Sequence, residues 1–285
     1  MKNKVLILGA SGSFGSNCVV AFKAAGWDVR TYKRGQDDMV EAAKGVDVIV
    51  NGLNPPNYKG WKETLPKIAR QVVAAAKASG ATLIQPSNVY NYGAQPGVWD
   101  ENTPHLATTK KGKIRIQMEQ ILRDSGVQVI LLRGGDFLDS KPSGNFIDFL
   151  TSKLAKGKLI YPGRADVAHA WAYLPDMARA AVGLAEIRGQ LSTFEDVPFT
   201  GLTITGEELR LAFEALEGRA IKLTGFPWLM MKLLSPVWGL AREIPEMRYL
   251  WDMPHSLSGA RMQQLLPDFH GTDSKEILRQ VISKA

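Results

Sequence analysis

The chain has 285 residues, of which 45% are hydrophobic and 22% are charged, and its formal net charge is +7. This length allows one large domain or two coupled ones, and this composition is ordinary for a soluble globular protein. The basic residues are scattered and form no Lys/Arg run with interleaved aromatics, so we expect a small-molecule substrate and no nucleic-acid partner.

The first predicted elements are a strand at Lys4–Leu8 and a helix at Ser13–Ala25, joined by glycines with the spacing G-x-x-G-x-x-G. A strand, a glycine turn and a helix in this order suit a dinucleotide, because the backbone can approach the pyrophosphate and the helix N–H groups face the anion. A tight turn without a ligand is the alternative. The residues expected at the phosphates are Gly9, Ser11, Gly12, Ser13, Phe14 and Gly15.

The first helix contains Cys18, which is the one cysteine of the chain and excludes an intrachain disulfide. The apolar run before it is short and leads into glycines rather than a cleavage site, so we read it as a strand and not as a signal peptide. A reducing, cytoplasmic location is therefore expected.

The second strand, Asp28–Tyr32, is followed by Lys33 and Arg34. Sites for NAD usually place a carboxylate at this point, which binds the ribose hydroxyls and repels a 2′-phosphate. A guanidinium can instead bind that phosphate through two hydrogen bonds. We therefore predict NADP(H) in preference to NAD(H), with two solvated charges as the alternative.

Polar residues follow the next two predicted strands, Val46–Val50 and Thr82–Gln85. After the first come Asn51, Gly52 and Leu53, where the cofactor ribose would pass. After the second come Ser87, Asn88 and Tyr90. Ligands bind at the carboxyl ends of strands in open α/β sheets, so these three could polarise a carbonyl or hydroxyl group. An ordinary polar loop is the alternative.

The helix Lys110–Asp124 carries Lys111 and Arg115 one turn apart on the same face, and Glu119 is placed to pair with Arg115. A solvated charged face is the alternative. A fifth strand, Gln128–Leu132, precedes Arg133.

Alternating strands and helices predict an α/β fold, a Rossmann-type doubly wound parallel sheet with a smaller, mostly helical C-terminal lobe. We assign residues 1–140 to the cofactor-binding domain, with 165–200 returning to it, and residues 141–164 and 201–285 to the substrate lobe. His169 is the best polar candidate in that lobe. The apolar helix predicted at Trp228–Ala241 is too short and too interrupted to span a bilayer, so we read it as buried, with a membrane-surface or dimer contact as the alternative.

These features in this order resemble the short-chain dehydrogenase/reductase superfamily, in particular its extended and atypical members. Arg133–Phe137 looks like the family's loop that closes on the nicotinamide, and Ala170–Ala178 resembles its W-x-Y-V-x-D-x-A segment. The departure lies in the Tyr-x-x-x-Lys motif, whose Tyr position is Lys111 here and whose Lys position is Arg115. This segment resembles the isoflavone reductase-like branch, in which a lysine is taken to act in place of the tyrosine, and NmrA-like proteins are the other relatives.

The resemblance implies an NADPH-dependent reductase of a small carbonyl or enone substrate, with Lys111 as proton donor aided by burial and by the neighbouring cations Lys113 and Arg115. Two alternatives stay open: an NAD(P)-dependent nucleotide-sugar epimerase or dehydratase, and a non-catalytic NADP-sensing regulator. We expect no metal and no membrane partner, and a homodimer stays open. The predicted catalytic residues are Lys111, Arg115, Ser87, Asn88 and Tyr90. The predicted cofactor residues are Gly9, Ser11, Gly12, Ser13, Phe14, Gly15, Lys33, Arg34, Asn51, Gly52, Leu53, Lys111 and Arg133.

Overall fold

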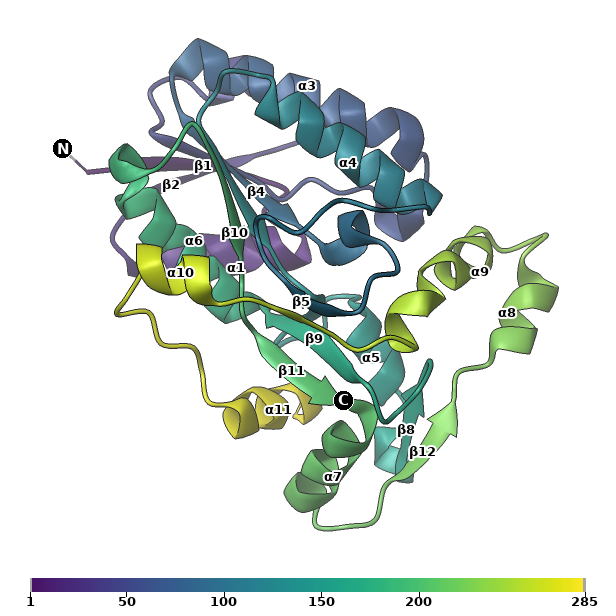
Figure 1. Cartoon of the computed structure of the whole chain (residues 1–285). Coiled ribbons are helices and arrows are strands. Elements are labelled where there is room, and N and C mark those ends of the chain that lie inside the picture. Colours follow the sequence, from purple (N-terminus) through teal and green to yellow (C-terminus); the bar gives the residue numbers. More distant parts are fainter. Residues whose placement is uncertain (1, 284–285) are drawn as a thin grey trace.

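A six-stranded, fully parallel sheet lies at the centre of the protein, whose computed structural model describes residues 2–283 (Figure 1). The strand order is β10-β6-β4-β3-β1-β2. Strand β2 is therefore added on one side of β1, and the later strands are added on the other side. Ligands of such sheets bind beyond the carboxyl ends of the strands at this switch point between β1 and β3. The six strands are β1 Lys4–Leu8, β2 Asp28–Tyr32, β3 Val48–Asn51, β4 Thr82–Ser87, β6 Val129–Arg133 and β10 Phe194–Pro198.

Helices cover both faces of this sheet, which explains why its central strands are nearly pure Val, Ile and Leu. On one face lie α3 (Trp61–Ser79) and α4 (Lys110–Arg123), whose buried residues pack against Leu6 and Leu83. On the other face lie α1 (Ser13–Ala24) and α6 (Leu174–Glu186). The short α2 (Met39–Ala42) follows β2. The predicted Rossmann fold class is confirmed.

Short strands build the remainder of the molecule. They form a three-stranded sheet, β11-β9-β7, and two pairs, β12-β8 and β13-β5. Strand β9 thus pairs with both β7 and β11 outside the central sheet, whereas α6 and β10 join it, so the chain crosses between the two parts several times. These strands are β5 Gly97–Trp99, β7 Asp136–Leu138, β8 Lys158–Tyr161, β9 Ala168–Tyr173, β11 Leu202–Thr205, β12 Lys222–Gly225 and β13 His255–Leu257.

The helices of this second part are short. The longest, α7, begins at a capping box in which Thr205 and Glu208 exchange hydrogen bonds. The α-helices are α5 Phe146–Thr151, α7 Gly206–Glu217, α8 Trp228–Leu234, α9 Gly239–Glu243, α10 Ala260–Leu265 and α11 Ser274–Ile282. The 3₁₀ helices of the whole chain are η1 Pro56–Tyr58, η2 Val89–Tyr92, η3 Leu154–Lys156, η4 Arg188–Gln190 and η5 Ile244–Trp251.

The helix predicted at 228–241 differs from expectation in two ways. It is divided into α8 and α9 around Pro236, because proline lacks the amide donor and restricts the residue before it. The prediction that it is buried is wrong for its outer side, since Leu229, Leu233 and Val237 are 72%, 72% and 85% exposed. Within residues 2–283, the structure contains no helix with the length and apolar character needed to cross a bilayer.

Candidate functional site at the carboxyl edge of the sheet

The glycine turn between β1 and α1 is shaped by close backbone contacts. Gly9 has a φ of +71°, and a Cβ on it would lie 2.6 Å from the carbonyl oxygen of Gly52. A Cβ on Gly15 would lie 2.2 Å from the carbonyl oxygen of Gly9, so this glycine lets α1 pack against the strand. Gly12 is exposed at the N-cap of α1, which has no side-chain cap and no acidic residue in its first turn. These features fit the diphosphate of a dinucleotide.

Of the other predicted cofactor residues of this turn, one is exposed and two already contact other parts of the protein. Ser11 is exposed, Phe14 is buried in the core beside α1, and the hydroxyl of Ser13 donates to the carbonyl oxygen of Ser143, 3.0 Å away. Lys33 and Arg34 are both exposed directly beyond the carboxyl end of β2. Their side chains are therefore accessible to a ligand at that edge.

The residues after β3 support the glycine turn. Asn51 is buried, and its side-chain amide donates to Gln85 Oε1 at 2.7 Å, which ties β3 to β4. A Cβ on Gly52 would lie 2.7 Å from the carbonyl oxygen of Leu8, and Leu53 is half-buried. Asn51 and Gly52 thus position the backbone of the turn.

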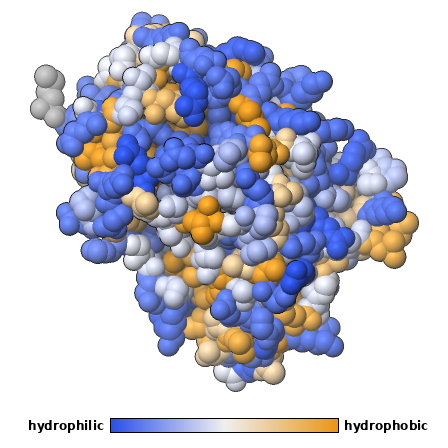
Figure 2. All heavy atoms as spheres, viewed as in Figure 1, coloured by the Kyte–Doolittle hydropathy of each residue, from blue (hydrophilic) through white to orange (hydrophobic). Residues whose placement is uncertain are grey.

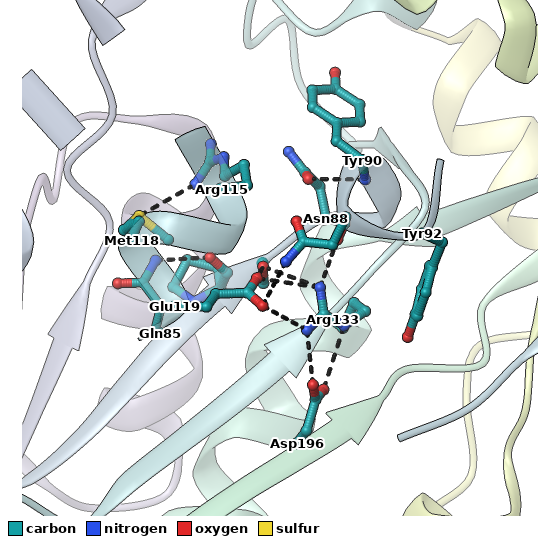
Figure 3. A network of polar contacts seen from close by, with 12 residues as sticks. Gln85, Asn88, Tyr90, Tyr92, Arg115, Met118, Glu119, Arg133 and Asp196 are labelled. Carbon is teal, nitrogen blue, oxygen red and sulfur yellow. Dashed lines mark hydrogen bonds and ion pairs between the residues drawn. The ribbon is translucent and has the colours of Figure 1, made fainter. Parts of the chain in front are cut away.

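Of the three candidates after β4, Tyr90 is the one whose polar side-chain group contacts η1. Ser87 donates to Glu119 and Asn88 accepts from the backbone N–H of Tyr90, so both are engaged in building the loop. The Tyr90 hydroxyl lies 3.3 Å from the hydroxyl of Tyr58 in η1. Figure 3 shows the Tyr90 side chain pointing away from Arg133.

Tyr58 was not identified from the sequence, and its backbone marks it as unusual. Asn57 and Tyr58 have φ values of 54° and 59°, and among residues 2–283 they are the only non-glycine residues with positive φ. A bulky residue in this region is strained, and such strain gathers at functional sites. Burial raises the pKa of both Tyr58 and Tyr90, whereas Arg115 favours the phenolate at each. The two phenols are therefore protonated near neutral pH.

Lys111 and Arg115 both lie on the buried face of α4, where they stack on aromatic rings. Lys111 Nζ is 4.9 Å from the ring centroid of Tyr58, and the Arg115 guanidinium is 4.5 Å from that of Trp61. Arg115 also donates to Asn54 Oδ1 at 3.1 Å, and burial lowers the pKa of its guanidinium. The predicted Arg115–Glu119 pair is wrong, because Glu119 is turned to the other side of the helix toward Arg133.

Lys111 is held by two carboxylates that the sequence analysis missed. Its ammonium donates to Glu243 Oε2 at 2.5 Å and to Glu246 Oε2 at 2.6 Å, and its side chain is only 3% exposed. Burial works against the charge of Glu246, but the hydrogen bonds from Lys111 lower the pKa of that carboxyl. Of the cations cited for Lys111, Lys113 is exposed and Arg115 turns to Trp61. The structure thus favours a positioning role for Lys111 over that of a free proton donor.

Arg133 is completely buried and lies at the centre of a polar network (Figure 3). It donates to Glu119 at 2.9 and 3.1 Å, to Asp196 at 2.7 and 3.3 Å, and to the carbonyl oxygen of Asn88 at 2.8 Å. Burial alone would lower the pKa of Arg133, but the two carboxylates raise it well above its usual value. All three guanidinium nitrogens are occupied, so the structure gives no support to a cofactor contact by this group.

The carboxylates around Arg133, together with a histidine, are close enough to one another to ligate a metal ion. Ligand atoms of His105, Glu119 and Asp196 all lie within 4.8 Å of one another. Arg133 already forms ion pairs with both acids, so we interpret this cluster as an ion-pair network.

His169 lies beside the phenol pair rather than in it. Its Nε2 is 2.9 Å from Asp136 Oδ2, and its ring stacks on Trp251 with centroids 3.9 Å apart. Asp136 interacts electrostatically with both Tyr58 and Tyr90, so the His169–Asp136 pair lies next to the two phenols. A pocket of about 320 Å³ lies elsewhere, next to α10 and α11, and no predicted site residue lines it.

No protein-family model matches this chain, and no curated protein sequence matches it. Solved structures are similar over nearly the whole length. MoeE5 in complex with UDP-glucose and NAD has a TM-score of 0.76 and 17% identity, with 99% of this chain and 98% of that chain covered. UDP-glucuronic acid 4-epimerase from Bacillus cereus, in complex with UDP-glucuronic acid and NAD, has a TM-score of 0.76, 13% identity and the same coverage.

A third similar structure is a dTDP-4-dehydrorhamnose reductase from Clostridium acetobutylicum, with a TM-score of 0.74, 17% identity and 98% of each chain covered. At these identities the likeness establishes the fold. The chain has the same fold as these three proteins, which agrees with the Rossmann-type fold that the sequence motifs predicted.

Proposed function

We propose that this protein is an oxidoreductase that uses a nicotinamide dinucleotide and acts on a sugar or sugar-nucleotide substrate, with Tyr90 as the group that transfers the proton. The observation that carries the proposal is the Tyr58–Tyr90 phenol pair beside two buried cations, at the carboxyl edge of a sheet whose first turn fits a diphosphate. The substrate class is suggested by the similar structures that contain UDP-sugars. The small enone substrate expected from the sequence has no such support.

When bound, a reduced nicotinamide supplies hydride to the carbonyl carbon. The phenol of Tyr90 carries its proton near neutral pH, and we propose that it donates this proton to the carbonyl oxygen, which completes the alcohol. Burial raises the pKa of Tyr90 and so works against the donation. Arg115 favours the phenolate that remains, and Tyr58, 3.3 Å away, is placed to return a proton. This arrangement favours reduction over oxidation, since oxidation of an alcohol would need Tyr90 as a base.

The test is turnover with Tyr90→Phe. We expect kcat to fall about 10²- to 10⁴-fold, the usual contribution of a positioned proton donor, with little change in dinucleotide binding. Tyr92→Phe is the matched control, because it removes a phenol from the same loop whose hydroxyl donates only to the carbonyl oxygen of Asp100. Unchanged kcat in Tyr90→Phe would remove Tyr90 from the mechanism.

A non-catalytic dinucleotide-binding protein is the second candidate, and the occupied state of Lys111 favours it. Titration of the dinucleotide tests the binding that both candidates require, and a turnover assay separates them, because only the enzyme requires turnover. Gly12→Val should abolish binding by blocking the approach of the diphosphate. Gly189→Ala, where a Cβ would meet nothing within 4 Å, should leave it unchanged.

We further propose that NADP(H) binds more tightly than NAD(H), because Lys33 and Arg34 are exposed at the end of β2, where NAD sites carry an acid. Two of the similar structures named above contain NAD, so direct measurement is needed. Replacing both residues with alanine should weaken NADPH binding about tenfold or more and leave NADH binding nearly unchanged. Lys77→Ala, an exposed cation on α3, is the control. Tighter NADH binding by the unaltered protein would contradict the proposal.

A further inference from the structure

An exposed apolar surface lies on the α8–α9 arm, which projects from one side of the molecule (Figure 1). Figure 2 shows this surface as an orange area at the right edge of the view. We call it the arm surface. Its members are Leu229, Met230, Leu233, Leu234, Val237 and Trp238, which are between 36% and 85% exposed.

Buried side chains, a hydrogen bond and an ion pair fix the inner side of the arm, so the residues on its outer side have a fixed arrangement. Met231 and Ala241 are buried in the main core of the second lobe. The indole of Trp228 donates to the carbonyl oxygen of Pro162 at 2.7 Å, and Glu243 binds Lys111. The inner residues thus anchor the arm while Leu229 and Leu233, one helical turn apart, face outward.

The charge of this segment favours an anionic partner. Residues 226–242 contain Lys232 and Arg242 but no acidic residue. Both cations are exposed, and the chain as a whole carries a net charge of +7. Apolar side chains flanked by Lys and Arg, with a tryptophan among them, are typical of a segment that lies in the interface of an anionic bilayer.

A second copy of the chain fits this surface less well. Two arms paired about a two-fold axis would bring the cations of one copy close to those of the other, and Glu243, the one acid of α8 and α9, is already paired with Lys111. Insertion into the headgroup region instead buries the leucines and places both cations next to phosphates. The arm is short, which suits lying in the interface rather than crossing it.

We infer that the arm surface docks the protein onto anionic membranes, with its apolar residues in the boundary between headgroups and acyl chains. The Lys111 site lies at the root of the same arm, since Glu243 ends α9. Membrane contact therefore takes place next to the candidate active site. The inference does not depend on the proposed enzymatic activity.

The test is co-sedimentation of the full chain with vesicles of phosphatidylcholine alone and of phosphatidylcholine mixed with phosphatidylserine. Binding should require the anionic lipid and weaken with added salt. Leu229→Glu with Leu233→Glu should reduce binding about tenfold or more, because it places charge in the apolar contact. Lys232→Glu with Arg242→Glu should reduce it about tenfold through charge reversal alone.

Matched controls are Val98→Glu on β5 and Leu211→Glu on α7, which charge exposed apolar positions elsewhere and should leave binding unchanged. No binding to anionic vesicles, or equal loss in the controls, would overturn the inference. So would a dimer in sedimentation velocity that Leu229→Glu with Leu233→Glu converts to a monomer without any vesicle binding, since the surface would then serve self-association.

Discussion

At the scale of single residues, the most informative side chain is Arg133, a fully buried cation between two carboxylates. It joins β6 to α4 through Glu119 and to β10 through Asp196, so one guanidinium links three elements of the Rossmann layer. Burial raises the pKa of Asp196 even with Arg133 beside it, which shows how strongly this site disfavours unpaired charge.

Replacement of Arg133 by methionine tests this role. Glu119 and Asp196 would be left without their cation, and loss of one member of a buried pair costs about 3–5 kcal/mol of unfolding free energy. Urea denaturation of Arg133→Met measures the loss. Adding Glu119→Gln and Asp196→Asn to that variant should restore part of it, because the buried negative charges are then gone. A stability equal to that of the unaltered protein would show that the network is dispensable.

The sequence could not have predicted this network. Arg133 follows a strand, as cofactor-binding residues also do, and its partner Asp196 lies 63 positions further along the chain. Glu119 was assigned to Arg115 because residues one turn apart share a helix face. The structure places Arg115 against Trp61 instead, and only the packing of α4 on the sheet decides between the two pairings.

At the scale of elements, the strands and helices of the central sheet were predictable because each carries its own signal. Strand β1 matches its predicted bounds, as does β2, and α1 and α4 differ from theirs by one residue at one end. Strands of three or four residues in the second lobe, such as β7 and β13, were missed because so short a segment cannot show an alternation of apolar and polar residues. Their existence depends on partners that are distant in the chain.

The contacts of α4 with α9 and η5 can be tested by mutation. Lys111 of α4 binds Glu243 of α9 and Glu246 of η5, whose side chains are 36% and 21% exposed. Lys111→Met should lower the free energy of unfolding by about 2 kcal/mol, less than for a fully buried pair because solvent screens the two acids. It should also increase amide exchange in residues 226–251. Lys113→Met, an exposed position on the same helix, is the control. If exchange rose equally in both variants, the Lys111 contacts would not be what holds the arm.

At the scale of the whole molecule, the site forms where segments distant in the chain meet. Tyr58, Tyr90 and Lys111 come from three separate elements, and Glu243 and Glu246 come from two more, α9 and η5. The sequence predicted Tyr90 from its place after a strand and Lys111 from the resemblance to the Tyr-x-x-x-Lys motif, but it gave no signal for the two glutamates. The one local signal for Tyr58 is the Pro-Pro-Asn-Tyr turn, which demands unusual backbone angles.

A buried histidine also links three short strands of the second part of the molecule and makes their packing sensitive to acid. His255, on β13 of the C-terminal segment, stacks on Trp99 of β5 with centroids 4.8 Å apart and meets His169 of β9 edge-on at 4.6 Å. It accepts a hydrogen bond from the backbone N–H of Ala170 at 3.5 Å, which requires the neutral ring. Burial, with a smaller contribution from His169, lowers the pKa of His255 to about 3.

This pKa fixes the sign of the pH dependence. In the unfolded chain the histidine titrates near pH ~6.5, so between that value and the folded pKa the unfolded state binds more protons than the folded state. Acidification through this window therefore destabilises the fold, by at most about 1.4 kcal/mol for each pH unit. His255→Phe keeps the ring stacking but cannot take up a proton, so its urea midpoint should fall less than that of the unaltered protein between about pH 7 and pH 5. The exposed His270→Phe is the control and should follow the unaltered protein. Parallel loss of stability in all three proteins would mean that groups other than His255 govern acid unfolding.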